Sequence, residues 1–107
     1  MGLFAILIAV AVYANNKNSK LDLEYLQTPQ VGDVYEYKIE SGRYSTLKVV
    51  EVAGDSVFVS PNDYEINKRT KLDEIDKAEN YGEFSYGIST KELKEMYDSG
   101  EIFDVNR

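Results

Sequence analysis

The sequence predicts a mainly β protein, a small domain of five short strands with one or two short helices, preceded by an apolar N-terminal helix. Its 107 residues suffice for one small domain and an anchor. Residues 2–14 carry no charge, whereas apolar and polar side chains alternate in several short runs after residue 33, with Gly, Asp, Asn and Pro between them. We therefore divide the chain into a membrane anchor helix at 1–16, a linker at 17–28 and the domain at 29–107.

The composition excludes several classes of function. The chain has no Cys and no His, so it contains no disulfide, no Cys/His zinc site, no Ser-His-Asp triad and no thiol nucleophile. All 19 acidic residues and ten of the 12 basic residues lie in residues 21–107, which gives that part a net charge of −9. Phosphates repel so acidic a domain, and we therefore expect no nucleic-acid partner.

The apolar head, residues 2–14, would form a helix of about 20 Å, shorter than the roughly 30 Å hydrocarbon core of a bilayer. We interpret it as a single-pass membrane anchor because it is apolar on every side and lacks the polar face of a surface helix. Two alternatives stay open, a secretory signal peptide cleaved after Ala14 and a hydrophobic helix buried in the domain or in a partner. The anchoring side chains, which end on an interfacial aromatic, are Leu3, Phe4, Ile6, Leu7, Ile8, Val10, Val12 and Tyr13.

The side of the membrane on which the domain lies depends on few charges. Lys17 and Lys20 follow the head and no base precedes it, which by the positive-inside rule alone would place the domain in the cytoplasm. Asp22 and Glu24 follow at once, and a basic leader upstream of Met1 would reverse the orientation. We expect an extracytoplasmic domain.

The linker leads into the first strand through a turn. The start of 17–28 is polar and low in helix propensity, as is typical of a linker, and its three leucines are placed to pack on the domain as a short lead-in. Residues 29–33 read Pro-Gln-Val-Gly-Asp, which is the chemistry of a turn. In residues 34–39 two tyrosines and an isoleucine share one face, which predicts a strand.

Two hairpins follow this strand. Gly42 can adopt the positive φ that the turn at 40–43 needs. Residues 44–52 form a long strand rich in β-branched side chains. It is apolar on both faces, which predicts a bend or bulge within it. After a Gly-Asp turn, residues 56–60 form the third strand.

The polar stretch at 62–80 interrupts the run of strands. It has few apolar side chains, so we expect it to be the most mobile part of the domain. In its second half, Thr70 is placed to cap a short helix. Residues 83–88 follow as a fourth strand, with Phe84 and Tyr86 on the same face as an isoleucine.

A capping box marks the last helix. Ser89 and Glu92 have the spacing in which each side chain caps the other's backbone amide, and Leu93 follows on the apolar face of the helix. Gly100 is placed to end this helix as its C-cap, and we expect residues 101–105 to form a short fifth strand.

The order of these elements resembles the SH3-like β-barrel. That resemblance rests on three meandering strands, an insertion, a fourth strand, a helical turn and a short fifth strand, opened by Val-Gly-Asp-Val-Tyr. The chain is also similar to small membrane-anchored proteins of Bacteroidetes-type bacteria, best in residues 29–33 and 89–96 and poorly in 62–80. The resemblance implies a fold and a membrane location, and it implies no catalytic residue.

Acids are the only abundant reactive groups, and their spacing favours no chemistry. The calcium-loop pattern, the Walker A motif and the dinucleotide-binding glycines are absent, so we expect no metal and no cofactor. No pair of carboxylates stands out for a glycosidase, and we identify no small-molecule substrate and no catalytic residue. Among the nine tyrosines, Tyr64 and Tyr81 fall on predicted loops and are candidate interface residues.

These observations lead us to expect a membrane-anchored, non-enzymatic interaction or accessory module. It would be a small subunit of an envelope complex, and its partner another membrane or envelope protein. One alternative is a secreted binding protein whose head is a cleaved signal peptide. A second is a small carboxylate-dependent hydrolase.

Overall fold

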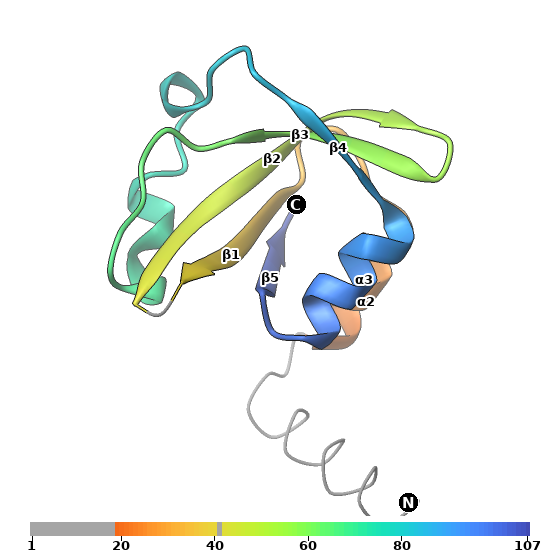
Figure 1. The fold of residues 1–107 in the computed structure, drawn as a ribbon, viewed down its shortest axis with the longest axis horizontal. Helices are drawn as coiled ribbons and strands as arrows, with labels where there is room; N and C mark the ends of the chain where they lie inside the picture. The colour runs from red at the N-terminus through yellow and green to blue at the C-terminus, as the bar shows by residue number, and fades with distance from the viewer. Residues whose placement is uncertain (1–18, 41) are drawn as a thin grey trace, which may run out of the picture.

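The computed structural model describes residues 19–40 and 42–107. In this part of the chain, five antiparallel strands form one open sheet in the order β4-β3-β2-β1-β5 (Figure 1). The prediction of a mainly β domain with five strands is therefore confirmed. The strands are β1 (Val34–Glu40), β2 (Arg43–Ala53), β3 (Ser56–Pro61), β4 (Tyr86–Ser89) and β5 (Ile102–Asn106).

Two helices pack side by side next to β5 (Figure 1). They are α2 (Ser19–Gln27) and α3 (Thr90–Asp98). Their buried leucines, Leu26 and Leu93, join the side chains of one sheet face in a single core. The long connection between β3 and β4 holds two short 3-10 helices, η1 (Arg69–Glu74) and η2 (Ala78–Asn80).

Helix α2 lies where we expected a linker. Residues 19–27 are helical because one side of the segment is buried against the domain, Asp22 at 1% exposure and Leu26 at 2%. The Val105 amide donates a hydrogen bond to Asp22 Oδ1 over 3.3 Å. Such packing outweighs the low helix propensity of the segment. The lead-in role expected for its leucines is confirmed for Leu26.

The bulge predicted for the second strand is present in β2. The register of β2 against β3 shifts between Val49 and Glu51, so one extra residue lies in β2 at this point. The first half of β2 pairs with β1 and the second half with β3. One face of the sheet carries the core, which consists of Leu26, Tyr35, Leu47, Val49, Val57, Val59, Ile88, Leu93, Ile102 and Val105.

The fourth strand is shorter than the alternation at 83–88 predicted. β4 begins at Tyr86, whose partner in β3 is Val59. Before Tyr86, the chain is joined to β3 by a side-chain hydrogen bond and not by strand pairing: the Ser60 hydroxyl donates to the Gly82 carbonyl over 3.1 Å. Phe84 is 67% exposed and Tyr86, although paired in β4, is 38% exposed, so neither aromatic packs in the core with Ile88.

Of the two predicted helix caps, one is present. The Glu92 amide donates to Ser89 Oγ over 3.0 Å at the start of α3, and Gly100 follows that helix with φ +85°. Thr70 does not cap a helix. It lies inside η1, whose N-cap is Lys68 without a side-chain hydrogen bond.

Candidate functional site

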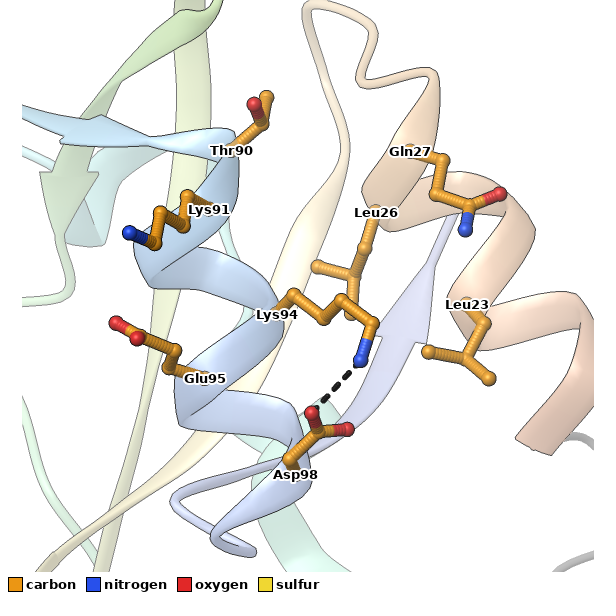
Figure 2. Close-up of a pocket in the computed structure, with 8 residues that line it drawn as sticks. All are labelled: Leu23, Leu26, Gln27, Thr90, Lys91, Lys94, Glu95 and Asp98. Atoms are coloured by element: carbon orange, nitrogen blue, oxygen red, sulfur yellow. Dashed lines mark hydrogen bonds and ion pairs between the residues drawn. The ribbon is translucent and has the colours of Figure 1, made fainter.

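A groove of about 390 Å³ runs between α2 and α3 (Figure 2). The two helices run in opposite directions, so Gln27 and Thr90 lie toward one end of the groove, with Leu23 and Asp98 toward the other. A space of this size holds a few side chains or a small ligand. The residues that line the groove are Leu23, Leu26, Gln27, Thr90, Lys91, Lys94, Glu95 and Asp98.

The groove is apolar along α2 and charged along α3 because of the faces that each helix buries. Helix α2 turns Leu26 into the core and leaves Leu23 half-buried at the groove. Helix α3 buries Leu93, so the charged residues on either side of it form the opposite rim. Lys94 Nζ and Asp98 Oδ2 form an exposed ion pair over 2.8 Å on this rim (Figure 2). An apolar wall beside a polar rim is the arrangement that binds apolar side chains of a helix or peptide.

An ion pair between the buried Asp33 and the partly exposed Arg107 holds the loop that follows α2. Arg107 Nε and Nη2 donate to the two carboxylate oxygens of Asp33 over 2.9 and 3.0 Å. Nη2 of the same guanidinium also donates to the Thr28 carbonyl over 2.7 Å, and Arg107 Cζ lies over the Tyr25 ring, 4.1 Å from its centre. The hydrogen bond to Asp33 raises the pKa of Arg107. These contacts fix the end of α2, and with it one wall of the groove.

A second buried carboxylate, that of Asp22, lies on the buried side of α2. Asp22 accepts from the Val105 amide and faces the hydroxyl of Tyr97, with 3.5 Å between the Tyr97 oxygen and Asp22 Oδ2. Burial and the nearby Asp22 raise the pKa of Tyr97 to about 12. Tyr97 is therefore a neutral phenol at physiological pH, and it links α3 to α2 below the groove.

The two candidate interface tyrosines have different surroundings. Tyr64 is 58% exposed. The Tyr81 hydroxyl lies 2.7 Å from the hydroxyl oxygen of Thr46 and 2.8 Å from Asp76 Oδ1, and Lys48 Nζ is 5.5 Å from the centre of its ring. Burial raises the pKa of Tyr81 to about 12. Tyr81 thus holds the connection between β3 and β4 onto β2, whereas Tyr64 faces solvent.

Polar side chains attach the 62–80 stretch to β2. Asn62 Nδ2 donates to Thr46 Oγ1 over 3.0 Å and to the Ile75 carbonyl over 2.7 Å. Leu72 of η1 is 1% exposed. The stretch is low in apolar residues, as the sequence indicates, but a buried leucine and a network of amide and hydroxyl groups hold it in place.

The acids of η1 and its neighbourhood influence one glutamate of the sheet. Burial raises the pKa of Glu36, and nearby Asp104, Asp73 and Asp76 raise it further, while a hydrogen bond from Asn106 opposes the shift. These carboxylates do not line the groove between α2 and α3. Within residues 19–40 and 42–107, no cluster of three or more acidic side chains is arranged to hold a metal ion.

The anchor residues predicted from the sequence, Leu3 to Tyr13, lie outside the described residues. Within the described ranges, no helix combines the length and the hydropathy required to cross a membrane. The sequence did not reveal the groove, because it predicts a linker at 17–28 whose leucines pack on the domain as a short lead-in. No protein-family model, curated protein or solved structure matches the chain.

Proposed function

We propose that this protein is a membrane-anchored, non-enzymatic interaction module that docks another membrane or envelope protein in the groove between α2 and α3. Its domain would be an SH3-like barrel on the extracytoplasmic side. The strand order β4-β3-β2-β1-β5 and the bulged β2 shared by two strand pairings support that fold. The apolar head at 2–14 supports the anchor.

One observation carries the proposal. The apolar wall of the groove belongs to α2, the helix that only residues 17 and 18 separate from the predicted anchor at 1–16. Leu23 remains half-buried there, with room beside it for an apolar side chain of a partner. The rim supports docking over catalysis, because Lys94 is paired with Asp98 and the chain has neither His nor Cys.

The experiment is purification of the full chain from its native membranes in mild detergent, with two matched leucine variants. Leu23→Gln places an amide in the groove, whereas Leu21→Gln changes an exposed leucine of the same helix outside it. We expect a partner in fixed stoichiometry with the wild type and with Leu21→Gln, and its loss with Leu23→Gln. Equal retention or equal loss in the two variants would contradict docking at the groove.

The anchor and its orientation are tested separately. Ile8→Arg places a charge in the middle of the apolar head, which costs about 2.5–3.5 kcal/mol on insertion scales and should release the chain from membranes. The chain has no Cys, so Tyr64→Cys introduces a single thiol at an exposed position. A membrane-impermeant maleimide should label it in intact cells, and labelling only after lysis would place the domain in the cytoplasm.

A further inference from the structure

We infer that the groove between α2 and α3 receives the juxtamembrane segment of another integral membrane protein in the same bilayer, bound as a short amphipathic helix. This inference rests on the proposed function, because it takes residues 1–16 as a membrane anchor. It adds the kind of partner and the part of that partner that docks.

The first argument is the length of the tether. Because α2 begins at Ser19 and packs on the domain, only residues 17 and 18 separate it from the predicted anchor. Three Cα–Cα steps of 3.8 Å span at most about 11 Å. The 12-residue linker that the sequence predicted would have allowed roughly four times that reach. The domain is thus held against the surface of the membrane.

The second argument is the position of the groove along α2. At 1.5 Å per residue, Leu23 lies about 6 Å and Gln27 about 12 Å along the helix from Ser19. Leu23 is therefore within about 17 Å of residue 16, and Gln27 within about 23 Å, in any orientation of the domain. This places the groove at the level where the first turns of a transmembrane helix leave the bilayer.

The third argument is the chemistry of the groove. Its wall offers the half-buried Leu23 beside Leu26, which belongs to the core and is only 2% exposed, and Lys94 and Asp98 on the rim neutralise each other. Such a surface fits an apolar side chain presented by a short amphipathic helix and selects neither a strongly acidic nor a strongly basic segment. Two proteins anchored in one bilayer hold such segments at high effective concentration, so a groove this small can bind without a large interface.

The test is site-specific photo-crosslinking of the full chain in its native membranes. Benzoylphenylalanine replaces Gln27 or Lys91 at the groove, and Glu51 on the exposed part of β2 as the control. We expect adducts from Gln27 and Lys91, absent from Glu51 and abolished by Leu23→Gln, which mass spectrometry maps to residues adjoining a transmembrane span. Adducts with a soluble protein, adducts with a second copy of this chain, or no groove adduct would each overturn the inference.

A longer tether separates this inference from the proposed function. Twelve Gly/Ser residues inserted between Lys17 and Asn18 lower the effective concentration, and we expect on the order of 10-fold fewer adducts. The same insert between Met1 and Gly2 leaves the tether unchanged and should leave the yield unchanged. If Leu23→Gln abolishes the adducts and the longer tether does not reduce them, the groove is a docking site but the juxtamembrane inference is wrong. If Leu23→Gln has no effect, the proposed function itself fails.

Discussion

Replacing Arg107 by alanine should be among the most damaging single changes in the domain. Its guanidinium reaches the carboxylate of Asp33, which is only 1% exposed, and also the Thr28 carbonyl and the Tyr25 ring. After truncation, the Asp33 carboxylate keeps the hydrogen bond from the Gln30 amide, 2.9 Å away, but loses its counter-ion. A buried charge without a partner is costly, because the interior solvates it poorly.

The magnitude follows from the burial of Asp33, which would keep a charge without a counter-ion. Removing one partner of a buried ion pair costs about 3–5 kcal/mol. The Arg107 side chain is 26% exposed, so water already screens part of the interaction and the low end applies, about 3 kcal/mol. In a domain of this size each kcal/mol lowers the melting temperature by about 4–8 °C, which predicts a loss of about 12–24 °C. The melting temperature of Arg107→Lys should lie between those of the wild type and Arg107→Ala, because lysine keeps the charge but not the bidentate hydrogen bonding.

The assay is thermal unfolding of the full chain in detergent at pH 7, followed by the near-ultraviolet circular dichroism of its tyrosines. The control is Arg43→Ala, which removes ion pairs to Glu40 and Glu65 from a side chain that is 56% exposed. Surface pairs contribute about 0–1 kcal/mol, so this variant should melt close to the wild type. Equal melting temperatures for Arg107→Ala and Arg43→Ala would refute the reasoning.

Three further predictions concern the cap, the sheet and the connection between β3 and β4. Ser89→Ala removes the N-cap of α3 and should lower the free energy of unfolding in urea by about 1 kcal/mol. Leu93→Ala truncates a fully buried side chain and should lower it by about 2–5 kcal/mol. Equal, negligible losses would mean that α3 does not pack on the core. Glu36→Gln should stabilise the protein at pH 7. The pKa of Glu36 is raised in the folded state, so its protonation favours folding and the wild type loses stability as the pH rises through that pKa. The advantage of the variant should shrink on acidification toward pH 4.5 in urea unfolding, and an advantage independent of pH would contradict this reasoning. Asn62→Ala should cost about 1–3 kcal/mol and speed amide exchange in residues 62–80; unchanged exchange would mean that the network does not hold this stretch.

The features predicted correctly from the sequence depend on near neighbours. The capping spacing of Ser89 and Glu92, the bulge in β2 and the turn before β1 each follow from side chains a few residues apart. Gly32 has φ +99° in that turn, a conformation that glycine adopts without strain. Local propensity and the constraints of the backbone are enough to specify such features.

The errors have a common cause in tertiary packing. The polar start of residues 17–28 predicts a linker, but the burial of Asp22 and Leu26 makes residues 19–27 a helix. Phe84 has the alternation of a strand residue, yet β3 stops pairing with β4 before reaching it. Propensity is a weak preference, and contacts with distant parts of the chain override it.

In the candidate site, too, some features follow from nearby residues and others only from tertiary packing. From the sequence we expect Leu21, Leu23 and Leu26 to pack on the domain as a short lead-in, but their spacing is interpreted as part of a linker and not of a helix. That spacing does not name the opposite wall, which α3 supplies from residues almost seventy positions away. Tyr64 and Tyr81 looked equivalent as loop tyrosines, and only their neighbours in space distinguish the exposed ring from the hydrogen-bonded one.

The sequence by itself determined the apolar head, the acidic domain, the number and order of the strands, and the start and end of α3. Each of these depends on composition or on a short period along the chain. Only the tertiary structure decided that residues 19–27 form a helix packed on the sheet, that two helices enclose a groove, and that Asp33 contacts Arg107 across 74 residues. Such tertiary contacts depend on how the strands pair and on which faces are buried together, and these are properties of the whole chain that no local pattern encodes.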